Sequence, residues 1–262
     1  HGVTLRIRGM LVRGALLDGA PTCRLRTSVT ITLHGPRLPA PLPPTYKGIH
    51  VAGSGRLALF GKRYQRTWAR LARPIAPNDT SVDVYGRVDD WESGQLVLLT
   101  TTALKDSREW HRNEEIVMER AVELLGESST SDVPITRLVL RVAARYAHAA
   151  SDAYQAEVGL LSRRIIIEGD AANSEPSDTT PRTCFMYSDA LGAYDTVPCA
   201  HTHLTGFGGH VLIDGPDATG HIAGVELRRM GQTNRHGRYP IHFHLMGNAS
   251  ISSATNMFTD AA

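Results

Sequence analysis

Residues 206–247 place the strongest constraint on how this chain folds. They contain three short segments rich in β-branched and other apolar residues, at 210–213, 225–228 and 241–245. Glycine-rich turns separate the segments, which begin at nearly constant spacing. The connections are too long for hairpins, which need turns of only a few residues. A regular repeat of strand and turn instead predicts a coiled sheet, in which each strand lies above the preceding one.

Side-chain alternation predicts which residues share a face, because successive strand residues point to opposite sides. In the third segment, the apolar side chains share one face while His242 and His244 share the other. In the second segment, Val225 and Leu227 point inward, while Glu226 and Arg228 point outward. In the first segment, Val211 and Ile213 point inward and His210 points outward. Direct stacking of the three strands would bring these five ionisable side chains into one cluster on a rigid outer surface.

Several motifs resemble a known family. The runs FGGH, GVELRRMGQ and GRYPIHFHLMG, with the upstream run AEVGLLSRRIIIEGD, resemble the family of the cell-migration-inducing hyaluronan-binding protein and the transmembrane cell-surface hyaluronidase. The opening of the chain resembles the later part of the eight-glycine (G8) domain that precedes the β-helix in that family. The resemblance implies an all-β fold, namely a right-handed parallel β-helix with a partial eight-glycine domain at the N-terminus. Fibrocystin-like proteins carry the same modules.

The resemblance also implies a domain organisation. We expect residues 1–105 to hold the C-terminal part of the eight-glycine-type domain and the start of the helix. Residues 106–262 are expected to hold β-helix rungs, with a polar insertion at 169–206 bounded by cysteines. Both ends of the sequence fall inside strand-like patterns, which predicts that the chain is truncated at both ends.

Two local predictions concern the middle of the chain. Trp68 lies in a connector and is expected in the core or on a lid. Residues 106–125 fit a helix, but residues 114–119 fit a strand equally well, and the family resemblance favours the strand.

Composition narrows the class of partner. The net charge is +2 in 262 residues, which is too small to indicate nucleic-acid binding. No apolar run approaches the roughly 18 residues that span a bilayer. The family resemblance implies an extracellular or cell-surface location. The expected partners are a glycosaminoglycan-like polysaccharide and other extracellular domains of the same longer chain.

Cysteines and sequons bear on secretion. Cys184 and Cys199 flank a loop-like stretch, where they either form a disulfide or remain reduced, and the family resemblance favours the bridge. Cys23 would then pair outside this chain or stay free. Asn78 and Asn248 each begin a sequon for N-glycosylation, which supports secretion weakly.

The predicted cluster suggests metal binding as one chemistry. His242 and His244 are spaced to offer two imidazoles to one ion, with His210 or Glu226 completing the site. Imidazole suits zinc, iron, nickel and copper, so the expected cofactor is one divalent metal ion. The alternative is a surface ladder of histidines that holds no metal.

Polysaccharide cleavage is the other chemistry. Hydrolysis needs two carboxylates; Glu226 supplies one, and no second is evident among Glu168, Asp214 and Asp217. Elimination in a uronate polymer instead needs a base and a cation that stabilises the resulting anion. His242 or His244 would act as the base, with Arg228 or Arg238 as the cation.

The arginines predict the polymer's charge. Arg229, Arg235 and Arg238, together with Arg228, would attract an anionic polymer such as hyaluronan, unless they form an ordinary solvated face. Together with the family resemblance, these residues predict two alternative functions. The chain binds, and as an enzyme would cleave, an anionic polysaccharide, in the manner of a hyaluronidase-like glycosidase or a polysaccharide lyase. Alternatively, it is a non-catalytic structural or adhesive ectodomain, as in fibrocystin-like or ciliary and flagellar surface proteins.

Overall fold

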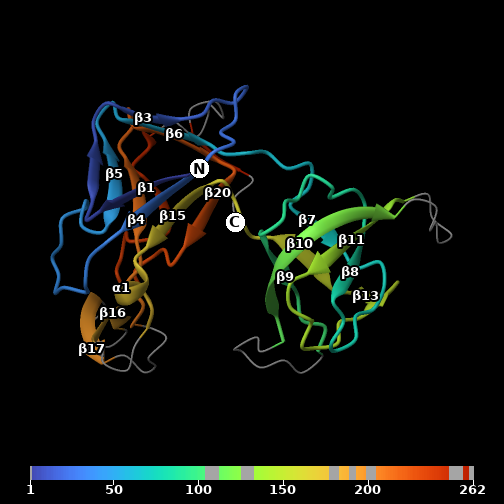
Figure 1. Ribbon diagram of the computed structural model, residues 1–262. Coiled ribbons are helices and arrows are strands. Elements are labelled where there is room, and N and C mark those ends of the chain that lie inside the picture. The colour runs from blue at the N-terminus through green and yellow to red at the C-terminus, as the bar shows by residue number, and fades with distance from the viewer. Residues whose placement is uncertain are drawn as a thin grey trace. The chain divides into compact units, whose positions relative to one another are not determined.

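The computed structural model describes residues 2–103, 112–124, 133–176, 183–188, 193–198, 205–247 and 256–259. This part of the chain is all-β apart from one short helix, α1 (Ala171–Ser174). The chain forms two compact units (Figure 1). Unit 1 comprises His1–Lys62 with Arg163–Ala261, and unit 2 comprises Arg63–Ser162. The domain boundary expected at residue 105 therefore lies inside unit 2.

Unit 1 is built from three four-stranded parallel sheets. Sheet A contains β1 (Gly2–Ile7), β4 (Ser28–Leu33), β15 (Ile165–Gly169) and β20 (Val225–Arg228). Sheet B contains β2 (Met10–Val12), β5 (Gly48–Ala52), β18 (His210–Asp214) and β21 (Ile241–His244). Sheet C contains β3 (Ala15–Asp18), β6 (Arg56–Phe60), β19 (Thr219–Ala223) and β22 (Asn256–Thr259). Successive strands of unit 1 join sheets A, B and C in that order, and this sequence of three strands occurs four times. Unit 2 is inserted between the second and third sets of three strands.

The predicted direct stacking of the three strand segments is wrong. β18 pairs with β21 in sheet B, whereas β20 pairs with β15 in sheet A. The reason is that residues 219–223 form a strand of their own, β19, which the sequence interpretation treated as part of a turn. Gly224 has φ 65°, and there the chain leaves β19 in sheet C and enters β20 in sheet A.

Apolar side chains fill the space between the sheets of unit 1. Val211, Ile213 and Val225 were predicted to point inward, and all three are 0% exposed. They belong to one core cluster with the apolar rows of the neighbouring strands, including Ile31 and Ile167. Each such side chain contributes about 1.5–3 kcal/mol by leaving water. The alternation rule is therefore confirmed for these three residues. It is wrong for Leu245, which was predicted to share the inward face with Ile241 and Phe243 but is 72% exposed, because it follows the end of β21 and has φ 50°.

Unit 2 is a six-stranded antiparallel sheet. Its order is β7 (Trp68–Arg70), β14 (Glu157–Leu160), β9 (Leu96–Leu99), β10 (Glu114–Leu124), β11 (Ile135–Leu140) and β8 (Ser81–Tyr85). A bridge between Leu71 and Val84 connects the two outer strands, so the sheet closes on itself. The pair β12 (Ala150–Ser151) and β13 (Tyr154–Gln155) forms a separate two-stranded sheet. β10 confirms the preference for a strand at residues 114–119, while residues 104–111 lie outside the described residues.

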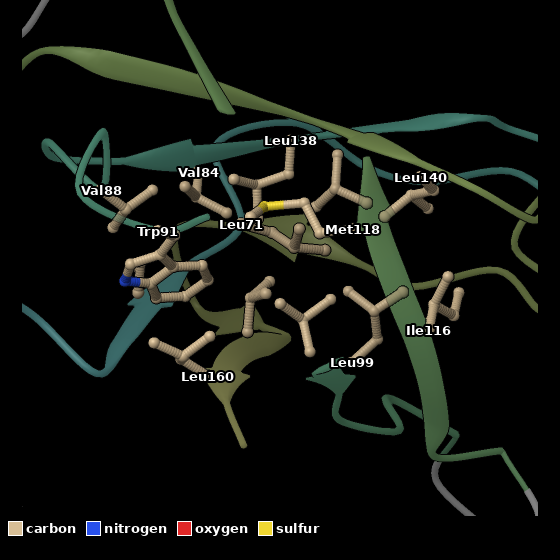
Figure 2. Packing of buried hydrophobic residues seen from close by; sticks show 14 of the residues in the cluster. Leu71, Val84, Val88, Trp91, Leu99, Ile116, Met118, Leu138, Leu140 and Leu160 are labelled. Carbon is tan, nitrogen blue, oxygen red and sulfur yellow. The ribbon is translucent and has the colours of Figure 1, made fainter. Parts of the chain in front are cut away.

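The core of unit 2 lies inside this sheet (Figure 2). Met118 and Leu138 are 0% exposed, and Trp91 is 3% exposed. The Trp91 indole has a polar edge as well, and its Nε1 donates a hydrogen bond to the Arg66 carbonyl over 2.9 Å. A buried tryptophan usually needs such an acceptor, so Trp91 is both a core side chain and a link to the connector before β7.

Trp68 does not lie in the core, so its predicted place there is wrong. Its indole is 53% exposed, whereas the next residue, Ala69, is 3% exposed. Strand alternation explains the difference, because β7 turns Ala69 toward the core and Trp68 and Arg70 toward solvent.

The insertion in unit 1 contains α1 and the antiparallel pair β16 (Thr183–Ser188) and β17 (Ala193–Pro198). Cys184 lies in β16 opposite Val197, but Cys199 lies outside the described residues, so the predicted disulfide remains a prediction. The same holds for the glycosylation site at Asn248. Asn78 is exposed, and Cys23 is an exposed free cysteine. No helix within the described ranges is long and apolar enough to cross a membrane.

Candidate functional site on sheet B

Four ionisable side chains meet on the outer face of sheet B. Asp214, at the end of β18, is the Cα partner of His244 on β21. Two residues earlier on β18, Leu212 lies between His50 on β5 and His242 on β21. Because strand side chains alternate, these residues point to the same side of the sheet. Tyr239 precedes β21, and its ring contacts that of His242. We call the following residues the histidine face: His50, Asp214, Tyr239, His242 and His244.

The carboxylate of Asp214 contacts two of the histidines. Nδ1 of His244 lies 2.9 Å from Asp214 Oδ1, and Nε2 of His50 lies 3.2 Å from Asp214 Oδ2. The hydrogen bond with His244 and the bond with His50 lower the pKa of the Asp214 carboxyl, against the opposing effect of burial. The ionised carboxylate in turn orients both imidazole rings.

Aromatic rings extend the histidine face beyond Asp214. The ring centroids of His242 and His244 are 5.1 Å apart, and those of Tyr239 and His242 are 4.9 Å apart. Nδ1 of His242 lies 3.3 Å from the Gly237 carbonyl oxygen. The side chain of His244 is 44% exposed, and Tyr239 is 44% exposed as well. A ligand that approaches this sheet therefore meets Tyr239 and His244 before the more buried His50.

This arrangement suits proton transfer and anion binding. Asp214 engages Nδ1 of His244, so Nε2 is the nitrogen left to exchange a proton with a ligand. A carboxylate behind an imidazole fixes its tautomer and the orientation of its ring. When His242 and His244 are protonated, their N–H groups donate charge-assisted hydrogen bonds to a ligand carboxylate.

His210 lies on β18 but not with the other histidines. It is 0% exposed, and its ring occupies the space that a side chain at Gly48, its Cα partner on β5, would need. Nε2 of His210 lies 2.8 Å from the Pro44 carbonyl oxygen and 2.8 Å from Nη1 of Arg238. Burial, together with the charge of Arg238, lowers the pKa of His210 to about 4. His210 is thus a neutral structural group beneath residues 36–46, which we call the proline-rich segment, and its expected outward exposure is wrong.

The predicted metal ligands do not converge. His210 Nε2 contacts Arg238 and the Pro44 carbonyl oxygen, whereas His242 and His244 lie on the histidine face. Within the described residues, no group of three His, Cys, Asp or Glu side chains has an arrangement suited to a metal ion. The residues present therefore do not fit the expected ion, and no chemistry is derived through a metal.

Glu226 and Arg228 lie on a different sheet from the histidine face. Both are on β20 in sheet A, where Glu226 is 4% exposed. Its Oε2 accepts a hydrogen bond from the Arg163 amide over 2.9 Å, and its Oε1 accepts one from Arg228 Nε. The structure therefore does not bring Glu226 or Arg228 together with His242 and His244.

The other predicted polymer-binding arginines link segments of unit 1. Arg229 Nη2 donates to Glu168 Oε2 over 2.6 Å, and its Nε donates to the Gly169 carbonyl over 2.8 Å. Arg235 Nη2 donates to the Leu38 carbonyl over 2.9 Å.

Arg238 makes the largest set of such bonds. Its Nη2 lies 2.7 Å from the Leu42 carbonyl oxygen and 2.9 Å from that of Pro43, while Nη1 contacts the Pro44 carbonyl oxygen at 3.2 Å. A planar guanidinium suits this multiple recognition of carbonyls. These bonds explain why Arg238 holds the proline-rich segment in place instead of projecting toward a polymer.

Sequence reasoning missed two groups that the structure emphasises. His50 lies between Ile49 and Val51 on β5, so alternation alone predicts that it points outward, but its register with β18 is not visible in the sequence. Lys47, 0% exposed, forms an ion pair with Asp170 over 3.0 Å and donates to the Gly35 carbonyl over 3.0 Å. No periodicity indicates that pair, because its members lie in the connections after β4 and β15.

Comparisons with known proteins were consistent with two modules. Residues 1–72 match the G8 domain family model, and residues 206–262 match the CEMIP beta-helix family model. The stretch between the two matches contains most of unit 2 and the polar insertion. The two matched regions together supply strands to all three sheets of unit 1.

Curated relatives match along nearly the whole chain. A G8 domain-containing protein of Dictyostelium discoideum is 33% identical over 98% of this chain and 16% of its own length. Communication mutant protein F of the same organism is 34% identical over 97% of this chain and 20% of its own length. Fibrocystin-L of Mus musculus is 29% identical over 92% of this chain and 6% of its own length. The chain thus spans no more than about a fifth of each of these three relatives.

Proposed function

Because this chain belongs to the family that joins a G8 domain to a CEMIP-type β-helix, with fibrocystin-like members, we propose that it is a segment of an extracellular or cell-surface protein that binds an anionic polysaccharide. The three parallel sheets would be the faces of a right-handed β-helix. Hyaluronan is the first polymer to test, since its repeating carboxylates match the charge that protonated histidines would bind. The observation that carries the proposal is the contact of Asp214 with both His50 and His244 on a partly exposed sheet face.

Binding follows from the charge of the histidine face. The Asp214 carboxylate holds the rings of His50 and His244 in place by its two contacts, so that their free ring nitrogens can meet an anionic ligand. A uronate carboxylate would accept hydrogen bonds from His244 and His242, and the exposed phenol ring of Tyr239 would contact the adjoining sugar. Arginine side chains are not needed for this mode, which agrees with their bonds to carbonyls and carboxylates within unit 1.

Cleavage of the bound polymer is the finer proposal. In the unprotonated form of His244, Nε2 would take the proton from the carbon next to the uronate carboxylate instead of donating a hydrogen bond to that carboxylate. The glycosidic carbon–oxygen bond would break as a carbon–carbon double bond forms. Protonated His242, whose ring centroid is 5.1 Å from that of His244, would give a proton to the departing oxygen. This is an elimination, and it needs no second carboxylate, unlike hydrolysis.

A non-catalytic structural or adhesive ectodomain is the second candidate. It is favoured by the placement of Glu226 and Arg228 on sheet A and by the internal bonds of Arg229, Arg235 and Arg238. Under this alternative, the histidine face would contribute only cross-strand contacts.

Binding of uronate polymers to the 262-residue chain distinguishes the two candidates. Hyaluronan and unsulfated chondroitin would be titrated at pH 5.5 and pH 7.5 (conditions of about one unit on either side of the ordinary histidine pKa), with uncharged dextran for comparison. We expect tighter binding at the lower pH, and we expect Asp214→Asn and His244→Gln each to weaken it about tenfold or more. Arg87→Gln, which removes one exposed charge from unit 2, should change binding little.

Elimination has its own readout, because it creates an unsaturated uronate that absorbs ultraviolet light. Absorbance growth in the wild type that disappears in His244→Gln would support the finer proposal. Binding without any new chain ends would limit the function to adhesion. If the wild type binds neither uronate polymer at either pH, the proposal is overturned and the structural ectodomain is favoured.

A further inference from the structure

The outer surface of unit 2 carries an exposed tryptophan beside an empty notch. Trp68 on β7 is 53% exposed, and its Cα partner on β14 is Gly159. A Cβ atom built at Gly159 would meet no heavy atom within 4 Å. The position across from the indole is therefore open, and we call this open space above Gly159, beside Trp68, the notch.

The usual structural explanation for such a pair does not apply. In many sheets an aromatic side chain lies over a glycine on the neighbouring strand and replaces its missing contacts. An indole that covered Gly159 would lie within contact of the Cβ position, and no atom does so. Nor does Trp68 take part in any ring or cation contact with the residues that the structure describes. Within the described residues, no such contact occupies the indole face.

The floor and sides of the notch combine apolar and polar groups. Gly159 is also the Cα partner of Leu98 on β9, which is half-buried, and Leu98 is in turn the partner of the exposed Glu115 on β10. Beside Trp68, the exposed residues Arg70 and Glu157 face one another across β7 and β14. No ion pair within 4.0 Å joins them among the described contacts, so both keep their hydrogen-bonding capacity.

We propose that this notch binds one pyranose ring of an uncharged glycan. The C–H face of the sugar would lie on the Trp68 indole and enter the space above Gly159, while its hydroxyl groups would bond with Arg70 and Glu157. This site goes beyond the proposed function and does not rest on it, because it lies in unit 2 and involves none of the histidine face.

The surroundings favour an uncharged sugar over other occupants. The site has two carboxylates, of Glu115 and Glu157, and one guanidinium, of Arg70. Its net charge is therefore negative, and it does not attract an anionic polymer. One indole and one half-buried leucine offer far less apolar surface than a stable protein interface needs. An apolar floor flanked by a few polar groups is instead the usual composition of a small-molecule site.

Titration of the 262-residue chain with uncharged hexasaccharides tests this site. The probes are linear hexamers of glucose, of mannose and of N-acetylglucosamine, with binding followed by calorimetry. We expect saturable binding of at least one probe, a loss of about tenfold or more in Trp68→Ala, and near wild-type affinity in Trp68→Tyr.

Gly159→Val tests the notch more directly, because it leaves Trp68 in place. It fills the notch where no atom is near, at a strand position that favours a β-branched residue, so the fold should tolerate it while binding is abolished. Gly14→Val is the matched control, because Gly14 in unit 1 also has no heavy atom within 4 Å of its Cβ position.

Two outcomes would overturn the inference: no wild-type binding of any of the three hexamers, or unchanged binding in folded Trp68→Ala and Gly159→Val proteins. A hyaluronan titration of the same variants separates this site from the histidine face. The two sites are independent if Gly159→Val still binds hyaluronan and His244→Gln still binds the hexamer. Hexamer binding that is lost in His244→Gln but retained in Gly159→Val would assign the sugar to sheet B instead.

Discussion

His210 shows how burial changes the chemistry of a single residue. The ring is covered by the proline-rich segment and contacts Arg238, so protonation would place a second positive charge beside a guanidinium in a site without water contact. The pKa of His210 is accordingly about 4, below its ordinary value of 6.5. Between these two values the unfolded chain binds more protons than the folded chain.

The stability of unit 1 should therefore fall as the pH decreases from 6.5 toward 4. A shift of this size contributes about 3 kcal/mol above pH 6.5, and that contribution disappears as the pH approaches 4. His210→Gln, which keeps an acceptor for Arg238, should remove that part of the pH dependence, as measured by urea unfolding across the range. His236→Gln, at an exposed position, should retain the wild-type slope. Equal slopes in His210→Gln and wild type would contradict the assigned cause.

Single residues were predictable where strand alternation decides their environment. Val211 and Ile213 follow that rule and are buried, and His242 and His244 follow it on the opposite face. His210 belongs to the same alternating row as Leu212, yet the proline-rich segment covers it through Arg238. Contacts made by irregular segments have no period. The sequence pattern therefore could not show which residues on the outer side of the sheet are covered by such a segment and which are exposed.

At the scale of elements, the glycine at the turn between β19 and β20 directs the chain from one sheet to the next. Gly224 lies between β19 and β20 with φ 65°, and its Cβ position is 2.9 Å from the Gly61 carbonyl oxygen and 2.9 Å from that of Lys62. The Gly61 amide also donates to the Ala223 carbonyl over 2.8 Å. Two connections are therefore packed backbone against backbone, which a side chain would prevent.

Gly224→Ala should destabilise unit 1 by about 2 kcal/mol or more, since alanine resists this backbone conformation and its methyl group would meet two carbonyl oxygens. Gly14→Ala has open space and no positive φ, and it should change stability by less than about 1 kcal/mol. Urea unfolding followed by far-ultraviolet circular dichroism gives both values. A Gly224→Ala protein as stable as Gly14→Ala would show that the corner is not constrained.

The strands themselves were largely predictable, whereas their partners were not. Residues 210–213, 225–228 and 241–245 were predicted as strands, and β18, β20 and β21 occupy nearly the same positions. The strand β19 was missed because its sequence, Thr-Gly-His-Ile-Ala, begins with residues typical of a turn. Missing one strand shifted the predicted stacking and placed Glu226 beside histidines that lie on another sheet.

At the scale of the whole molecule, the two units have separate cores. The buried apolar residues of unit 2 form one cluster, and those of sheets A, B and C form others, with no member in common among the described residues. The family resemblance indicated the parallel sheets of unit 1, but no motif indicated that residues 63–162 form a closed antiparallel sheet. Pairings such as that between Ile31 and Ile167 join segments on either side of unit 2, and sequence spacing does not reveal such distant partners.

Separate cores predict separate unfolding transitions. All three tryptophans of the chain, at positions 68, 91 and 110, fall in unit 2, so tryptophan fluorescence reports that unit alone. Leu138→Ala removes a fully buried side chain of unit 2 and should lower the fluorescence midpoint in urea by the equivalent of about 2–5 kcal/mol. Ile213→Ala makes a comparable cavity in unit 1. It should leave that fluorescence midpoint unchanged while destabilising the remaining transition seen by circular dichroism. If either substitution instead shifts both signals equally, the chain unfolds as one cooperative body, and a core that belongs to one unit contributes to the stability of the other.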